Sequence, residues 1–340
     1  MLDKKDIAGG GRPARALWYE SAGKASLRAT LCREPGAGEA LVRMKWSGIS
    51  RGTERLIFEG RVPESEYDRM RAPFQEGAFP FPVKYGYCAV GIVEAGSAAL
   101  LGRDVFVLHP HATHFAVPDA SVRSLPEGLP ARRAVLAANM ETALNALWDS
   151  GAGPGDRIAV VGCGLVGLLV IYLCAGLPGA DVVAVDADAG RADIVAALGA
   201  QFHTAKDFAS TRDFGADVVF HASASPAGLA LAINAAGREG RIVEMSWYGE
   251  GDVPAPLGGA FHSGRLQLIS SQVGQVSPSR RPRWDYGRRL GKAMELLRDP
   301  RLDALVTHEF AFEELPERLP EFLRAGAPGL AAVIRYPQGD

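Results

Sequence analysis

The chain has 340 residues, 47% of them hydrophobic, which is enough for two domains with separate cores. Its formal net charge of −2 lacks the positive excess of a nucleic-acid-binding domain, so no nucleic-acid partner is expected. No apolar run reaches the eighteen or so residues of a membrane span, so no membrane association is expected. Residues 1–13 are polar and glycine-rich, lack the apolar core of a signal peptide, and are interpreted as a disordered leader.

The cysteines are scattered, and none forms a C-x-x-C pair or a zinc-knuckle spacing. In a chain of this length, such cysteines are typical of reduced thiols, and a cytoplasmic location is expected. The four are Cys32, Cys88, Cys163 and Cys174.

The first third of the chain alternates short apolar runs with turn residues, and few helical patterns interrupt them. This pattern predicts an antiparallel, barrel-like β domain. The charged segment 61–81 contains three prolines and is expected to be a loop with one short helix. The expected strands are 14–19, 39–47, 89–94, 104–108 and 115–117.

The second part alternates short β-rich runs with helix-period segments, which predicts a doubly wound parallel sheet and an α/β fold class. The expected strands are 158–161, 182–185, 218–220, 242–245 and 266–269, and the expected helices are 165–175, 191–198 and 227–236. Two more helices, 286–297 and 314–324, and a final strand, 331–336, are too few for a third domain. We therefore expect a β domain of residues 14–135 and 277–340 and a Rossmann domain of residues 136–276.

A dinucleotide-binding motif follows the first strand of the predicted parallel sheet. The motif is G-x-G-x-x-G, and its residues are Gly162, Cys163, Gly164, Leu165, Val166 and Gly167. A strand leads into it, an apolar helix follows it, and Asp186 closes the next strand about twenty residues later. The helix start attracts a diphosphate. Asp186 can accept hydrogen bonds from the adenosine ribose and would repel a 2′-phosphate, so NAD is favoured over NADP as the cofactor.

The order of these parts resembles the medium-chain dehydrogenase/reductase superfamily from residue 14 to residue 336. Three local stretches carry the resemblance: Pro154-Gly155-Asp156-Arg157, Gly86-Tyr87-Cys88-Ala89-Val90-Gly91 and Ser47-Gly48-Ile49-Ser50-Arg51-Gly52-Thr53-Glu54. The resemblance implies a GroES-like catalytic β domain, a Rossmann domain and NAD(P)-dependent oxidoreductase activity. The last two stretches look most like a zinc-lacking branch that includes bacteriochlorophyllide hydroxyethyl dehydrogenases.

The zinc-binding members of that superfamily differ from this chain at their ligand positions. By spacing, the three catalytic ligands fall on Ser50, Tyr87 and Ala138, and none of these side chains is a good zinc ligand near neutral pH. The four-cysteine lobe of many zinc members is also absent. No catalytic or structural zinc is expected.

Hydride transfer without a metal needs a hydrogen-bond donor or acid to polarise the substrate oxygen. Tyr87 carries a phenolic proton at a former ligand position, and Ser50 and Thr53 could relay a proton. These three are the candidate catalytic residues. The alternative is that Tyr87 is a core aromatic with a satisfied hydroxyl. The hydroxyls of Ser50 and Thr53 could likewise bond only to the backbone of a turn.

Two further residues are cofactor candidates through the resemblance. Arg51 matches a position where relatives place a basic residue against the phosphates, and an arginine fork suits phosphate. Thr142 matches a threonine that lines the nicotinamide pocket. A surface role for Arg51 and a packing role for Thr142 are the alternatives. Glu54 and Glu141 are nearby carboxylates, and neither is proposed as the base.

The segment His109-Pro110-His111-Ala112-Thr113-His114 contains three of the seven histidines. If it were a strand, His109 and His111 would share a face and could bind a metal, an acidic substrate group or a proton. A polar loop is the alternative. His221 follows a strand at the ligand-binding edge of the sheet, but a lone histidine there is more often structural.

The favoured function is a zinc-independent alcohol dehydrogenase or carbonyl reductase that acts on a small-molecule secondary alcohol or its carbonyl. A quinone or enoyl reductase of the same superfamily is a second hypothesis, although such enzymes usually prefer NADPH. A third is a non-catalytic NAD-binding protein, because fold alone does not determine function. The last Rossmann strand could pair across a homodimer, as it does in many relatives.

Overall fold

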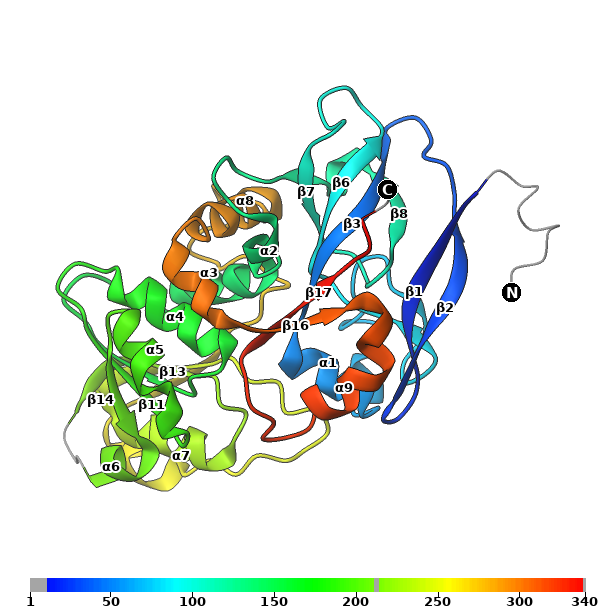
Figure 1. The fold of residues 1–340 in the computed structure, drawn as a ribbon. Coiled ribbons are helices and arrows are strands. Elements are labelled where there is room, and N and C mark those ends of the chain that lie inside the picture. The colour runs from blue at the N-terminus through cyan, green and yellow to red at the C-terminus, as the bar shows by residue number, and fades with distance from the viewer. Residues whose placement is uncertain (1–10, 211–213, 339–340) are drawn as a thin grey trace. The chain divides into compact units, whose positions relative to one another are not determined.

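The computed structural model describes residues 11–210 and 214–338, and the chain divides into two compact units (Figure 1). Unit 1 comprises Met1–Ala138 and Met294–Asp340, and unit 2 comprises Asn139–Ala293. Of the expected leader, residues 1–13, the first ten lie outside the described residues. Its last residues are not a leader: Arg12 and Pro13 belong to β1 (Arg12–Ser21), where strand pairing and an ion pair from Arg12 to Glu94 hold them.

Within the described residues, unit 1 is built mainly from antiparallel strands. One sheet has the order β2-β1-β5-β4, and the other has the order β16-β17-β3-β6-β7-β9, with β8 paired to β3. Only β16 and β17 pair in parallel in the second sheet. The strands are β2 (Lys24–Cys32), β3 (Glu39–Ile49), β4 (Glu76–Gly77), β5 (Val83–Lys84), β6 (Ala89–Ala95), β7 (Asp104–Val107), β8 (His114–Pro118), β9 (Arg123–Ser124), β16 (Val306–Ala311) and β17 (Ala331–Arg335).

Three helices accompany these strands: α1 (Arg51–Phe58), α2 (Ala131–Ala134) and α9 (Leu315–Phe322). The segment 61–81 contains the short helix Glu64–Glu66, as expected, together with β4. The barrel-like β domain is therefore confirmed, whereas β2 and α1 were not anticipated.

Unit 2 contains a parallel sheet whose described strands have the order β12-β11-β10-β13-β14-β15. Numbered within the unit, this is the order 3-2-1-4-5-6 of a Rossmann fold. The strands are β10 (Arg157–Val161), β11 (Asp181–Asp186), β12 (Gln201–Thr204), β13 (Ala216–His221), β14 (Ala236–Glu244) and β15 (Gln267–Ser270). The helices are α3 (Ala137–Ser150), α4 (Leu165–Ala175), α5 (Ala192–Ala197), α6 (Ala205–Ser210), α7 (Pro226–Ala235) and α8 (Tyr286–Leu296).

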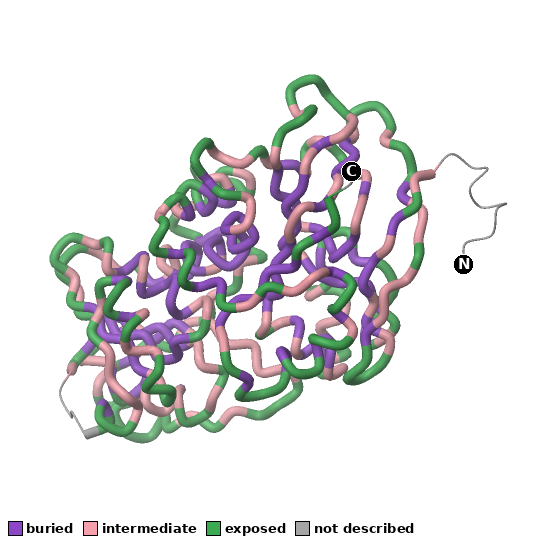
Figure 2. Tube along the Cα trace, in the orientation of Figure 1, coloured by how far each residue is buried: buried purple, intermediate pink, exposed green. Residues whose placement is uncertain are grey.

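The central strands β10, β11 and β13 of unit 2 are mostly buried, which explains their nearly continuous apolar sequences, whereas the edge strands β12 and β15 are not (Figure 2). Side chains from β10, β11 and β13 form one cluster with α7, and they include Val183, Val219 and Ile233. This packing fixes the carboxyl ends of the strands at one edge, where ligands bind in open α/β sheets.

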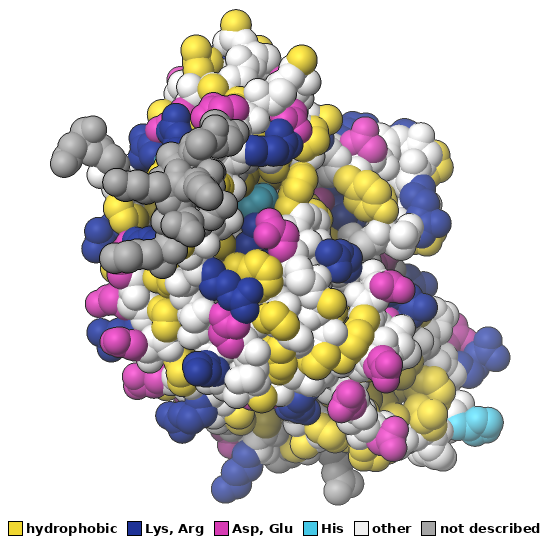
Figure 3. Space-filling view, turned by 90° about the vertical axis from the view of Figure 1, so that its right-hand side faces the viewer, with side chains coloured by type: hydrophobic (Ala, Val, Ile, Leu, Met, Phe, Trp, Pro, Cys, Tyr) yellow, Lys and Arg dark blue, Asp and Glu magenta, His cyan; other side chains and the backbone are white. Residues whose placement is uncertain are grey.

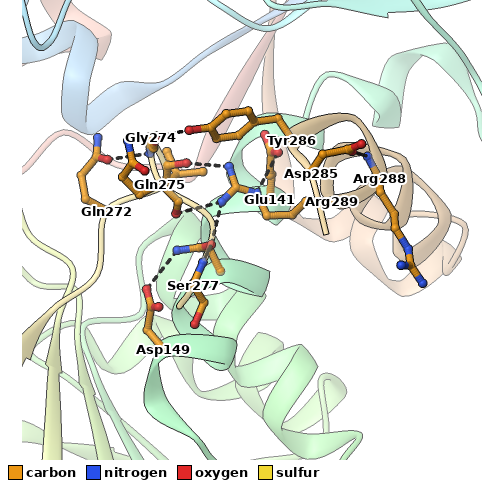
Figure 4. A network of polar contacts seen from close by, with 12 residues as sticks. Glu141, Asp149, Gln272, Gly274, Gln275, Ser277, Asp285, Tyr286, Arg288 and Arg289 are labelled. Atoms are coloured by element: carbon orange, nitrogen blue, oxygen red, sulfur yellow. Dashed lines mark hydrogen bonds and ion pairs between the residues drawn. The ribbon is translucent and has the colours of Figure 1, made fainter. Parts of the chain in front are cut away.

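The chain returns to unit 1 at Met294, later than the expected residue 277. The reason is a buried guanidinium in α8 (Figure 4). Arg289 Nε donates to Glu141 at 3.0 Å, and its Nη1 donates to Asn145 at 2.6 Å. Arg289 also donates to the backbone carbonyls of Gln275 and Val273, so residues 273–289 are held on α3.

The surface carries both signs of charge. Acidic and basic side chains alternate over the face shown in Figure 3, and neither sign forms a continuous expanse there. No helix within residues 11–210 and 214–338 is long and apolar enough to cross a membrane.

We predict that Arg289→Met destabilises the protein strongly. The substitution removes the donor to the buried carboxylate of Glu141 and one of the two donors to the amide oxygen of Asn145, and breaking a buried ion pair typically costs about 3–5 kcal/mol. Denaturant unfolding measures the loss. The exposed Arg288, one residue earlier in α8, provides the control: Arg288→Ala should cost less than about 1 kcal/mol. Equal losses in the two variants would show that the network does not stabilise unit 2.

Candidate functional site

The turn between β10 and α4 has the geometry of a phosphate-binding loop. Gly162 has φ +106°, a conformation that other residues rarely adopt. A Cβ at Gly167 would collide with the carbonyl oxygen of Gly162, so α4 packs directly against the turn. A Cβ at Gly164 would meet nothing within 4 Å, and no side chain caps the helix that starts there. The turn therefore fits a dinucleotide, whose diphosphate would lie against the helix start.

Asp186 is held beside this turn. It is the last residue of β11, and its Oδ2 accepts a hydrogen bond from the backbone N–H of Cys163 at 2.6 Å. Its Oδ1 accepts from the N–H of Asp188 at 2.9 Å. Each carboxylate oxygen retains acceptor capacity, so Asp186 can still accept hydrogen bonds from a ligand.

The three hydroxyl residues predicted in unit 1 come together. The phenol of Tyr87 donates to Ser50 Oγ at 2.5 Å, and the hydroxyl of Thr53 lies within hydrogen-bonding reach of the same phenol oxygen. Burial holds the pKa of Tyr87 above its usual range, although the bonds to Ser50 and Thr53 act in the opposite direction. Tyr87 is therefore protonated at neutral pH and can donate a hydrogen bond.

A fully buried carboxylate orients the helix that carries Ser50 and Thr53. Glu54 lies in α1, and its Oε1 accepts from the backbone N–H of Ser50 at 2.7 Å. Its Oε2 accepts from the hydroxyl of Tyr19 at 2.6 Å and bonds to His111 Nε2 at 3.0 Å. These three partners give Glu54 a structural role at the start of α1.

The residues at the zinc positions do not fit a zinc site. Ser50 and Tyr87 bond to each other, Ala138 has no donor atom, and neutral hydroxyls are poor zinc ligands. Among the described residues, no group of three or more His, Cys, Asp or Glu side chains could hold a metal ion.

Arg51 and Thr142 occupy different units. Arg51 donates to the backbone carbonyls of Ala327 and Gly329 and lies over the ring of Phe322, all within unit 1. Its contact with cofactor phosphates stays a prediction. Thr142 lies on α3, in unit 2, and its place in a nicotinamide pocket also stays a prediction.

The chain between β7 and β8 is a loop, so the polar-loop alternative for the segment with His109 and His111 is the correct one. His109 stacks on Phe115 with ring centroids 3.7 Å apart, and its Nδ1 bonds to the carbonyl of Pro110. His111 instead bonds to Glu54 and Ser47. His114 is half-buried and bonds to Thr113.

The sequence interpretation missed one polar cluster in unit 2. His221 is not isolated: it contacts Ser223 and Glu244 at the carboxyl edge of the sheet. The signal was available in principle, since His221 directly follows one predicted strand and Glu244 lies near the end of the next, and neighbouring parallel strands bring such residues side by side.

Comparison with known proteins agrees with this architecture. The family profile of zinc-binding dehydrogenases matches residues 166–285, within unit 2. D-guloside 3-dehydrogenase from Escherichia coli K12 is 25% identical, and the alignment covers 94% of this chain and 96% of the relative.

Two solved structures share the fold. A putative zinc-binding dehydrogenase from Sinorhizobium meliloti 1021, bound to NADP, has a TM-score of 0.76 and 18% identity, covering 95% of this chain and 99% of the other. An alcohol dehydrogenase from E. coli CFT073, complexed with NADH, has a TM-score of 0.73 and 18% identity, covering 96% of this chain and 100% of the other.

The chain has the two-domain fold of medium-chain dehydrogenases/reductases, with a GroES-like and a Rossmann domain, and its residues 166–285 match the zinc-binding dehydrogenase family. It is an NAD(P)-dependent dehydrogenase or reductase of the medium-chain type.

We predict that His109 makes stability depend on pH. Burial, reinforced by the charge of Lys84, lowers the pKa of His109 to about 3. An unfolded histidine titrates near about 6.5, so between these values only the unfolded chain binds the proton. The free energy of unfolding should therefore fall as the pH drops from about 6.5 toward 3, by up to about 1.4 kcal/mol per pH unit.

Unfolding of His109→Asn across this range tests the prediction, and its slope against pH should be shallower than that of the wild type. The exposed His262 supplies the control, since His262→Asn should keep the wild-type slope. A wild-type slope in His109→Asn would contradict the assignment.

Proposed function

We propose that this protein is a zinc-independent dehydrogenase or carbonyl reductase that transfers hydride between NAD(H) and a secondary alcohol or its ketone. The observation that carries the proposal is the Tyr87–Ser50–Thr53 contact. It brings hydrogen-bond donors together at positions that, by the sequence resemblance, hold a Lewis acid in relatives that bind zinc.

The cofactor would supply the hydride chemistry when bound. Gly162, Gly164, Leu165, Val166 and Gly167 would hold its diphosphate, and Asp186 would hold its adenosine ribose. In the reductive direction, Ser50 would donate the proton that the carbonyl oxygen gains when its carbon receives the hydride, and Tyr87, which donates to Ser50, would replace that proton. Thr53 would keep the phenol oriented. Arg51 and Thr142 remain cofactor-contact candidates from the two units.

The secondary-alcohol class is supported by the E. coli relative, which is named as a dehydrogenase of D-gulosides at position 3. Carbon 3 of a pyranoside carries a secondary alcohol. Hydride exchange between labelled NADH and a panel of secondary alcohols, ketones, quinones and enones tests the class. Exchange with enones or quinones alone would replace the proposal with the reductase alternative, and no exchange with any compound would favour a non-catalytic protein.

We predict that the protein binds NADH more tightly than NADPH. Asp186 would accept bonds from the ribose and would repel a 2′-phosphate. Fluorescence titration with both cofactors measures the preference, and Asp186→Ser should reduce it. The exposed Asp193, on α5 of the same unit, supplies the control: Asp193→Ser should leave the preference unchanged. Tighter binding of NADPH by the wild type would refute this choice of cofactor.

We predict that Tyr87→Phe lowers turnover by about 10²–10⁴-fold, the usual contribution of general acid catalysis. Its affinity for NADH should not change, because the phenol is assigned to the substrate oxygen. Stopped-flow turnover and equilibrium titration separate these two quantities.

A metal control accompanies this variant. Purified wild-type protein should contain no stoichiometric zinc and should stay active after prolonged chelation. If activity disappears on chelation and zinc restores it, the assignment of Tyr87 is wrong.

A further inference from the structure

A second hydrogen-bonded cluster lies at the carboxyl edge of the unit 2 sheet. His221 ends β13 and Glu244 ends β14, and the two residues are register partners in neighbouring parallel strands. His221 Nδ1 bonds to Glu244 Oε2 at 2.7 Å. His221 Nε2 bonds to Ser223 Oγ at 2.6 Å. The order is therefore carboxylate, imidazole, hydroxyl, running from the sheet toward the loop after β13.

The carboxylate fixes the direction of these hydrogen bonds. Glu244 Oε1 accepts from the N–H of Ser246, and Oε2 accepts from the hydroxyl of Tyr248 at 3.2 Å. Burial alone would raise the pKa of Glu244, but the bonds from His221 and Ser246 hold it below its usual range. A carboxylate only accepts, so a neutral His221 carries its proton on Nδ1 and accepts at Nε2.

Ser223 must then donate its proton inward to His221. Its oxygen keeps unused lone pairs, so Ser223 presents a hydrogen-bond acceptor to whatever lies in front of it. His221 is fully buried, whereas Ser223 is partly exposed, so the serine hydroxyl rather than the imidazole can reach a ligand beside the dinucleotide turn.

The backbone around Ser223 is shaped to hold it beside the dinucleotide turn. A Cβ at Gly162 would lie 2.6 Å from the backbone nitrogen of Ser223, so the loop touches the first glycine of the motif. Ala224 has φ +50°, a conformation that residues with a side chain rarely adopt. A Cβ at Gly228 would collide with Ser223 Oγ, so the glycine leaves room for the hydroxyl.

The strand order indicates which half of the cofactor would face this cluster. A dinucleotide crosses a Rossmann sheet at the switch point between its first and fourth strands, here β10 and β13. Asp186 ends β11, on one side of β10, and is assigned to the adenosine ribose. The nicotinamide half then lies on the side of β13 and β14, where Ser223 is.

We propose that Ser223 contacts the cofactor by accepting a hydrogen bond from a ribose hydroxyl of its nicotinamide half, and that His221 and Glu244 are positioning residues that act through Ser223. This inference rests on the proposed dinucleotide site of unit 2. It adds to that site a residue, Ser223, that would contact the nicotinamide half of the cofactor and not the adenosine half.

Binding titrations with NADH, reduced nicotinamide mononucleotide and ADP test the proposal. Loss of one neutral hydrogen bond should weaken binding of NADH and of the mononucleotide to Ser223→Ala by about 2–10-fold. The affinity for ADP should not change. The exposed Ser263 of the same unit supplies the control, because Ser263→Ala should bind all three ligands like the wild type.

A double-variant comparison tests whether His221 acts through Ser223. His221→Gln should weaken NADH binding in the wild-type background and have no further effect in Ser223→Ala, whereas a merely structural histidine would weaken both. Ser223→Ala changes a partly exposed position, so the titrations stay decisive if His221→Gln fails to fold.

Three outcomes would overturn the inference: unchanged affinity of Ser223→Ala for NADH, equal losses for ADP and the mononucleotide, or additive effects of the two substitutions. If the wild type binds neither NADH nor ADP, the proposed function fails together with it. Normal wild-type binding with an unaffected Ser223→Ala variant removes this inference alone.

Discussion

The candidate cofactor site of unit 2 depends on the absence of a side chain at Gly162. Its φ of +106° turns the chain from β10 into α4, and the space where a Cβ would lie is bounded by the backbone of Ser223. The carbonyl oxygen of the same residue is packed against Gly167. One position therefore sets the approach of the helix, the openness of the turn at Gly164 and the place of the loop after β13. A side chain there would disturb all three together.

In unit 1, the backbone at the start of α1 is held by a buried carboxylate, that of Glu54. The helix that starts at Arg51 begins with a polar stretch, and no side-chain cap holds its first turn. Glu54 takes over that task from inside the core, because its carboxylate accepts the backbone N–H of Ser50 while Tyr19 and His111 satisfy its other oxygen. A buried carboxylate without partners would be very costly, so this arrangement is rigid. It holds Ser50 against Tyr87, two positions that the sequence resemblance assigned to zinc ligands.

The features that depend on local sequence patterns could be predicted from the sequence. The features that depend on contacts between distant residues could not. The apolar runs of β10 and α4 and the glycine spacing between them identified the Rossmann unit. Helix α1 was missed because its sequence has no apolar period at its start. Glu54, which holds the helix in place, is hydrogen-bonded to Tyr19 and His111, which lie 35 and 57 positions away in the sequence. The boundary near residue 294 was misplaced for the same reason, because Arg289 reaches back to α3. The histidine segment is a loop, and the sequence did not predict that its rings have partners on separate elements.

Each unit contains a hydrogen-bonded network of a hydroxyl, an imidazole and a carboxylate. The two networks differ in how deeply their hydroxyl ends are buried, and therefore in their roles. In unit 1, Ser47, His111 and Glu54 form a hydroxyl–imidazole–carboxylate chain, and in unit 2 Ser223, His221 and Glu244 form another. Ser47 is fully buried, and its oxygen is also hydrogen-bonded to the hydroxyl of Tyr336, so the network of unit 1 ends inside the core. Ser223 is partly exposed and borders a glycine turn. A hydrogen-bonded network whose members are all buried and paired helps to specify the structure. A network that ends at a partly exposed acceptor retains hydrogen-bonding capacity for a ligand.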